Sequence, residues 1–129
     1  MVKKKILVTG ANGLLGQKII YNLKNRTDVT LLASSIGTNR LVETNGYKYV
    51  ELDITNKKEV KNLISYEQPD AVINCAAMTN VDKCENNQKE CWEINVNAVE
   101  NIAISCESIK AHVLHLSTDF VFDGTAGPY

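Results

Sequence analysis

The stretch KILVTGANGLLG, residues 5–16, decides the fold class of this 129-residue chain. Its apolar start, Lys5–Thr9, ends at a glycine, which is typical of a strand buried on both faces. Apolar residues then recur at helical spacing from Leu15 to Leu23, which predicts a helix over Leu14–Asn25. The glycines between strand and helix read G-x-x-G-x-x-G, the context in which such a motif binds a nucleotide.

Each glycine of this turn has a separate expected role. Gly10 permits a tight turn off the strand, Gly13 lets the backbone approach a pyrophosphate, and Gly16 lets the helix pack against the sheet. The start of the helix adds unpaired N–H groups and a partial positive charge, which both favour phosphate. A tight turn alone would not require three glycines at this spacing, so the motif favours a nucleotide site.

Beyond the turn, apolar runs alternate with helical patterns. Four further strands are predicted, over Val29–Ala33, Tyr47–Leu52, Ala71–Cys75 and Ala111–Ser117. Asn56, with Glu59 three positions later, marks the start of another helix. This alternation predicts an α/β fold, a Rossmann-like doubly wound parallel sheet of strand order 3-2-1-4-5 with helices on both faces. We expect one dinucleotide-binding domain over residues 1–129.

A third helix is predicted before the last strand. Its apolar residues step by four, three, four and three, at Trp92, Val96, Val99, Ala103 and Cys106. This spacing predicts one continuous buried face, with Trp92 as a core anchor. His112 and His115 flank the last strand and are interpreted as packing or edge residues.

Composition limits the possible partners and the cellular compartment. The net charge is -1, which argues against a duplex nucleic-acid binder. No apolar run approaches the roughly 20 residues that cross a bilayer, so we expect no membrane partner. The four cysteines show no C-x-x-C spacing. We interpret them as reduced thiols of a cytoplasmic protein rather than as a disulfide or zinc framework.

The end of the second strand bears on the choice of cofactor. No acid follows Ala33 until Glu43, so the usual partner of an adenosine ribose 2′-hydroxyl is missing there. Ser34 and Ser35 could bond a 2′-phosphate, and Arg40 could pair with it, although Arg40 fits a solvated loop equally well. NADP is therefore favoured over NAD, which stays open.

Two later stretches resemble a known family. Residues 73–85, INCAAMTNVDKCE, and residues 116–124, LSTDFVFDG, followed by Gly127-Pro128-Tyr129, are similar to dTDP-4-dehydrorhamnose reductases of the extended short-chain dehydrogenase/reductase superfamily. The resemblance covers the whole chain. It implies NAD(P)H-dependent reduction of the 4-keto group of a dTDP-deoxysugar, a step of dTDP-rhamnose biosynthesis, with a nucleotide sugar as the small-molecule partner.

The resemblance also implies roles for individual residues. Thr118 matches the hydroxyl member of the family's Thr-Tyr-Lys catalytic set, and without the resemblance Ser117-Thr118-Asp119 would fit a strand-to-loop turn. Asp53 either accepts a hydrogen bond from adenine or caps the following helix. No metal ligand is expected. The expected cofactor-binding residues are Gly10, Asn12, Gly13, Leu14, Leu15, Gly16, Ser34, Ser35, Arg40, Asp53, Ile54, Cys75, Ala76, Ala77, Thr79 and Asn95.

One departure from the family pattern concerns the proton donor. The superfamily uses a Tyr-x-x-x-Lys pair, and no tyrosine of this chain has a lysine four positions later. Tyr129 matches the Gly-Pro-Tyr stretch instead. We therefore expect this chain to be the amino-terminal part of a longer protein and to be inactive alone. The alternative is a non-catalytic cofactor-binding subunit that resembles the regulatory β-subunit of methionine adenosyltransferase. A homodimer is left open.

Overall fold

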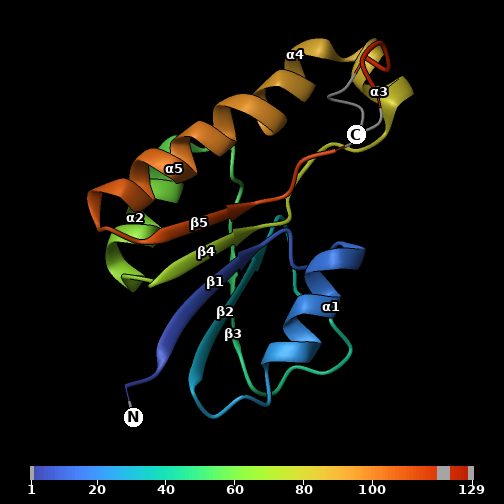
Figure 1. Ribbon diagram of the computed structural model, residues 1–129. Helices are drawn as coiled ribbons and strands as arrows, with labels where there is room; N and C mark the ends of the chain where they lie inside the picture. The colour runs from blue at the N-terminus through green and yellow to red at the C-terminus, as the bar shows by residue number, and fades with distance from the viewer. Residues whose placement is uncertain (1, 119–122, 128–129) are drawn as a thin grey trace.

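The parallel sheet is the centre of the computed structural model, which describes residues 2–118 and 123–127 (Figure 1). Its described strands are β1 Lys4–Thr9, β2 Val29–Ser35, β3 Lys48–Glu51, β4 Ala71–Asn74 and β5 His112–His115. They lie in the order β3-β2-β1-β4-β5, and every neighbouring pair is parallel. The predicted strand order is confirmed.

Helices cover both faces of the sheet (Figure 1). Helix α1, Leu14–Leu23, lies on one face, while α2, Lys57–Glu67, and α5, Ala98–Ser108, lie together on the other. The chain leading into α5 forms α3, Val81–Asn86, then α4, Gln88–Trp92, and a π-helical turn η1, Glu93–Asn97. The sheet with a helical layer on each face confirms the doubly wound arrangement.

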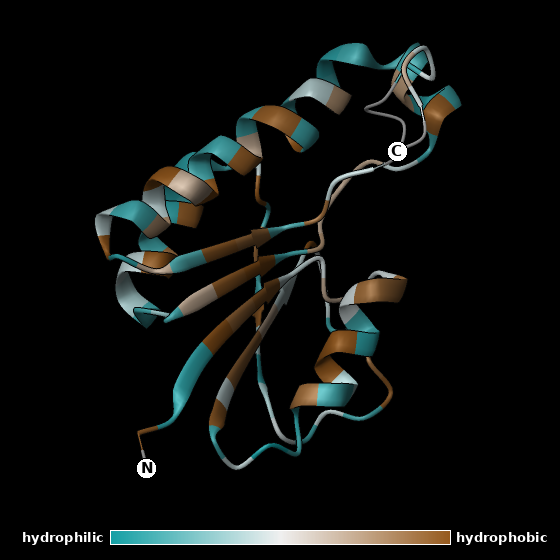
Figure 2. Ribbon diagram, viewed as in Figure 1, coloured by the Kyte–Doolittle hydropathy of each residue, from teal (hydrophilic) through white to brown (hydrophobic). Residues whose placement is uncertain are grey.

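The alternation of side chains along the strands divides the core into two halves. Leu7, Leu32 and Val72 belong to the cluster beneath α2 and α5. Their chain neighbours Val8 and Leu31 belong to the cluster beneath α1. Figure 2 shows apolar residues concentrated on the central strands and interspersed with polar ones along the helices. Burial on both faces explains the continuous apolar runs within β1 and β2.

Strand register brings three loops to one edge of the sheet. Thr9, the last residue of β1, pairs with Ser34 of β2 and with Asn74 of β4. The glycine turn therefore lies between the segments that follow β2 and β4. No helix connects β2 to β3 within residues 36–47, and this segment runs along α1 instead (Figure 1), where Val42 N donates to Tyr21 Oη at 3.1 Å.

The predicted buried face of the third helix is confirmed at Cys106 and wrong at Trp92 and Val96. Trp92 is 62% exposed and Val96 is 40% exposed, whereas Ala98 and Ile102 are buried against the sheet in their place. Two apolar stripes run along this helix, so the sequence alone did not show which one faces inward. The π turn before Ala98 adds to the difference, because an expanded turn rotates the residues on its two sides relative to one another.

The expected reduced state is wrong for one pair of cysteines. Cys84 of α3 and Cys91 of α4 form a disulfide over a sequence separation of seven. Cys75 is free and half-buried, and Cys106 is free and buried. Among the residues described, no helix combines the length and apolarity needed to cross a bilayer.

A cluster of charged side chains lies at the opposite end of the strands from the glycine turn. The Glu67 side chain is only 9% exposed, and its Oε1 accepts a hydrogen bond from Lys48 Nζ at 2.5 Å. Lys5 Nζ reaches the backbone oxygen of Glu67 at 2.7 Å and its Oε2 at 3.4 Å. The hydrogen bond from Lys48 is the main reason that the pKa of Glu67 is lowered.

Candidate functional site

The glycine turn is held by close backbone packing. Gly10 has φ +68°, and a Cβ on it would lie 2.6 Å from Ala76 N, in the segment after β4. A Cβ on Gly16 would collide with the backbone of Gly10 and Ala11. Gly16 thus lets α1 approach the turn itself. At Gly13, a Cβ would meet only Gly10 O, at 3.3 Å.

The start of α1 is open towards the same edge. Gly13 is the N-cap and supplies no side-chain cap. The first amides of a helix have no partner within the helix, so those of Leu14 and Leu15 are available to a ligand. Leu14 is 81% exposed and Leu15 is 44% exposed. Open amides, a helix dipole and backbone without side chains fit a pyrophosphate, so the turn suits the dinucleotide that the sequence predicts.

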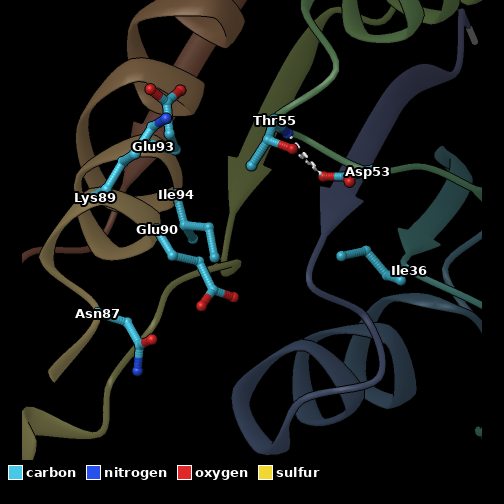
Figure 3. Close-up of a pocket in the computed structure, with 8 residues that line it drawn as sticks. All are labelled: Ile36, Asp53, Thr55, Asn87, Lys89, Glu90, Glu93 and Ile94. Atoms are coloured by element: carbon cyan, nitrogen blue, oxygen red, sulfur yellow. Dashed lines mark hydrogen bonds between the residues drawn. The ribbon is translucent and has the colours of Figure 1, made fainter. Parts of the chain in front are cut away.

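Two connected hollows continue from this turn. A groove of about 250 Å³ is lined by Gly10, Gly13, Asp53 and Ala76, among others. A wider cavity of about 580 Å³ lies between the segments after β2 and β3 on one side and α4 with η1 on the other (Figure 3). Ile36, Asp53 and Thr55 line both hollows. Together they form a path along the carboxyl edge of the sheet, where open α/β sheets bind ligands.

Asp53 forms a local turn and does not cap α2. Its Oδ1 accepts hydrogen bonds from Thr55 N at 2.9 Å and from Thr55 Oγ1 at 2.7 Å (Figure 3). The N-cap of α2 is Asn56, which accepts from Glu59 N, as its sequence pattern predicts. Ile54 is buried. The interpretation of Asp53 as the cap of α2 is therefore wrong, and its role at an adenine stays a prediction.

The end of β2 differs from the sequence-based expectation. Ser34 is fully buried, and its hydroxyl donates to Val8 O at 3.5 Å, so it does not face the ribose region. Ser35 is half-buried and Arg40 is exposed. Sequence reasoning missed an acid here, because Glu51 lies beside Ser35 only through pairing of β3 with β2. Glu51 Oε1 accepts a hydrogen bond from Gly37 N at 3.1 Å.

A chain of polar side chains, buried at Thr9 and Asn74, links β1, β4 and β5. Asn74 Oδ1 accepts from Thr9 Oγ1 at 2.5 Å and from Ala76 N at 3.3 Å. The amide nitrogen of Asn74 therefore faces His115 Nδ1, 3.1 Å away, and donates to it. This histidine lines the cavity described next, which its interpretation as an edge residue did not anticipate.

Asn95 fixes the backbone that follows β4. Its Oδ1 accepts from Met78 N at 2.8 Å, and its Nδ2 donates to Met78 O at 3.0 Å. The same Nδ2 lies 3.3 Å from Cys91 Sγ. Asn95 stands in the π turn η1, and such turns are frequent at functional sites. The structure thus gives the predicted site residue a positioning role.

A cavity of about 540 Å³ contains the predicted catalytic hydroxyl. Thr118, just after β5, lines it together with Met78, Thr79 and Asn95. Ala77 lines both this cavity and the groove at the glycine turn, so the two meet there. Burial raises the pKa of the nearby Cys75 thiol, which therefore stays neutral beside the groove. Residues 119–122, Pro128 and Tyr129 of the family motifs lie outside the described residues.

The structure thus brings most of the predicted residues to one edge. Among the cofactor candidates at this edge, Ser34 turns its side chain inward. Within residues 2–118 and 123–127, no cluster of three His, Cys, Asp or Glu side chains could hold a metal ion.

Comparisons of this chain with known proteins agree on one family. A family model described as RmlD substrate binding domain matches residues 4–129. The chain is 35% identical over 120 residues to the dTDP-4-dehydrorhamnose reductase of Aggregatibacter actinomycetemcomitans. It is 30% identical over 126 residues to methionine adenosyltransferase 2 subunit beta of Bos taurus. These matches cover 93% and 98% of the chain, but it spans only 36% of the length of each relative.

Solved structures agree with this result. A dTDP-4-dehydrorhamnose reductase from Clostridium acetobutylicum superposes with a TM-score of 0.76 at 36% identity, over 96% of this chain and 39% of that one. The reductase of the same name from Bacillus anthracis, solved in complex with NADP, superposes with a TM-score of 0.80 at 28% identity. That match covers 98% of this chain and 40% of the Bacillus anthracis chain.

Proposed function

The chain belongs to the RmlD substrate binding domain family, and on this premise we propose that it is the dinucleotide-binding part of an NAD(P)H-dependent reductase. The proposed substrate is a dTDP-deoxysugar with a 4-keto group, as in dTDP-4-dehydrorhamnose. The observation that carries the proposal is the open glycine turn, whose groove joins the Thr118 cavity at Ala77. We further propose that residues 1–129 form one NAD(P)-binding unit.

In this proposal the groove orients the cofactor from end to end. Gly13 lets the pyrophosphate approach the backbone, and the amides of Leu14 and Leu15 hold it, because the helix start presents unpaired donors there. Asp53 and Ile54 lie at the adenine, and Cys75, Ala76, Ala77 and Thr79 run beside the nicotinamide end. The exposed Arg40 supports NADP over NAD, as does the NADP of the Bacillus anthracis structure, while the Glu51 carboxylate beside the end of β2 is engaged with Gly37 N.

The chemical step needs a hydride and a proton. The bound dihydronicotinamide supplies the hydride, and negative charge then develops on the keto oxygen of the sugar. The Thr118 hydroxyl donates a hydrogen bond to that oxygen and orients it, as an oxyanion donor does. The proton donor of the family is a tyrosine paired with lysine, and the proposal assigns it to the full-length protein, outside these 129 residues.

A second candidate is a cofactor-binding subunit without turnover. The observation in its favour is the 30% identity to methionine adenosyltransferase 2 subunit beta, over 98% of this chain. Both candidates predict a bound dinucleotide, so only turnover separates them. A cytoplasmic location is part of the first candidate, and cell fractionation tests it.

The test follows NADPH oxidation by the full-length protein with a dTDP-4-keto-6-deoxysugar, beside calorimetric titration with NADPH. We expect turnover, and Thr118→Val should lower kcat by about 10² while the NADPH affinity stays within about twofold. Thr30→Val, the same change on β2 at the Lys5 register position, is the control. NADPH binding without turnover would favour the second candidate, and a Thr118→Val enzyme as fast as the wild type would refute the role of Thr118.

A further inference from the structure

The side chain of Asn12 bonds the loop that follows β2. Asn12 stands in the glycine turn, and its Nδ2 donates to Thr38 O at 3.0 Å and lies 3.4 Å from Ile36 O. Its Oδ1 accepts from Arg40 N at 2.9 Å. One amide thus holds both ends of residues 36–40, which we call the selectivity loop. Because the amide is used for these bonds, Asn12 contacts the loop rather than offering its side chain to the pyrophosphate.

Tyr49 of β3 holds the same loop from the other side. Its hydroxyl donates to Gly37 O at 2.7 Å and accepts from Asn12 Nδ2 at 3.3 Å. Burial raises the pKa of Tyr49, so the phenol keeps the proton that this bond needs. The side chains of Asn12 and Tyr49, which come from separate elements, therefore bond the same loop and also each other. We call this arrangement the Asn12–Tyr49 clasp.

The selectivity loop lies where the two cofactors differ. The end of the second strand in a dinucleotide-binding sheet is where the adenosine ribose 2′ position is recognised. Two opposite charges stand there: the exposed guanidinium of Arg40 and the carboxylate of Glu51, which accepts from Gly37 N. The cation favours a 2′-phosphate, and the anion favours a free 2′-hydroxyl. The path of residues 36–40 decides which of them faces the ribose.

We propose that Asn12 and Tyr49 are positioning residues for cofactor selectivity. The clasp holds the selectivity loop so that the Arg40 guanidinium faces the 2′-phosphate of NADP, while Glu51 is kept on the amide of Gly37. The inference rests on the proposed dinucleotide function. It adds the residues that set the preference, neither of which contacts the phosphate itself.

The experiment measures affinities by calorimetry, with NADPH, NADH, adenosine 2′,5′-bisphosphate and ADP as ligands. Tyr49→Phe removes only the hydroxyl of the clasp. The affinities for NADPH and the bisphosphate should fall by about fivefold to tenfold, while those for NADH and ADP stay within about twofold. Tyr66→Phe, the same change on an 82% exposed residue of α2, should alter none of the four.

A second variant tests whether the clasp acts through Arg40. Arg40→Gln should lose the same preference for NADPH over NADH. Adding Tyr49→Phe to Arg40→Gln should lower the NADPH affinity little further, because both changes remove the same interaction with the 2′-phosphate. Equal losses for NADPH and NADH in Tyr49→Phe, an unchanged ratio, or additive effects with Arg40→Gln would overturn the inference and leave the proposed function intact. A wild-type protein that binds neither dinucleotide would overturn both.

Discussion

Replacement of Gly10 by alanine tests how tightly the glycine turn is packed. Gly10 has φ +68°, and its added Cβ would lie 2.6 Å from Ala76 N and 2.7 Å from the carbonyl carbon of Cys75. These are backbone atoms and cannot rotate away as a side chain would. Gly37 provides a matched control, because it has φ +73° but nothing within 4 Å of an added Cβ. The two variants share the backbone cost and differ in the collision.

The magnitudes follow from these two contributions. Left-handed backbone costs an alanine about 1 to 2 kcal/mol, which applies at both positions. The collision at Gly10 should add about 1 to 3 kcal/mol, the range for overpacking a site that cannot relax. The entropy that alanine removes from the unfolded chain is the same in both variants and cancels in their difference. Gly10→Ala should therefore be destabilised by at least about 1 kcal/mol more than Gly37→Ala.

The assay is urea unfolding of both variants and the wild type, followed by circular dichroism. The midpoints should fall in the order wild type, Gly37→Ala, Gly10→Ala, with equal slopes. Gly13→Ala is a third arm: its φ is -78° and its Cβ meets only Gly10 O, so stability should change little while NADPH affinity falls. Equal destabilisation of Gly10→Ala and Gly37→Ala would show that the close approach to the segment after β4 is wrong.

Three further outcomes are expected. Glu67→Gln should lower the free energy of unfolding by about 1 to 2 kcal/mol at pH 7. Because the folded pKa is lowered, this difference should decrease as the pH falls below the ordinary glutamate pKa of about 4.3 and be lost once the pH falls through the lower folded pKa, in urea titrations at several pH values. Dithiothreitol, which reduces Cys84–Cys91, should cost about 2 to 3 kcal/mol in unfolding at pH 8, and Cys84→Ser should abolish that sensitivity. Asn95→Ala should raise the hydrogen-exchange rate of the Met78 amide by at least about tenfold, because it removes the acceptor of that amide. If Asn95 does not position this backbone, the exchange rate should stay at the wild-type level.

Local sequence patterns were sufficient for most of the fold. The apolar run before Gly10 predicts β1, and the Asn56-to-Glu59 spacing predicts the start of α2, because both signals come from residues that contact one another within a few positions. The face of the helix from Trp92 onward was not predictable in this way. Two stripes of similar apolarity compete there, and only packing on the sheet selects the one that contains Ile102.

The residues of the candidate site also divide into those that the sequence indicates and those that only the structure shows. Gly10, Gly13 and Gly16 are a contiguous motif, so the sequence shows them directly, and the family motifs point to Thr118. Asn12 contacts Ile36 24 positions away, Asn74 contacts His115 41 positions away, and Glu51 contacts Gly37 14 positions away. No sequence spacing indicates these partners. Ser34 was misplaced for a related reason, since the sequence does not reveal that its side chain turns inward towards β1.

By itself the sequence determined the order of strands and helices, the phosphate-binding turn and the family of this protein. These depend on short-range periodicity, on the conformational freedom of glycine and on contiguous motifs. Only the tertiary structure decided which charges stand at the end of β2, which thiols pair, and that Asn95 and the Asn12–Tyr49 clasp hold backbone. Those features depend on strand register and helix packing, which bring together residues that are distant in the chain.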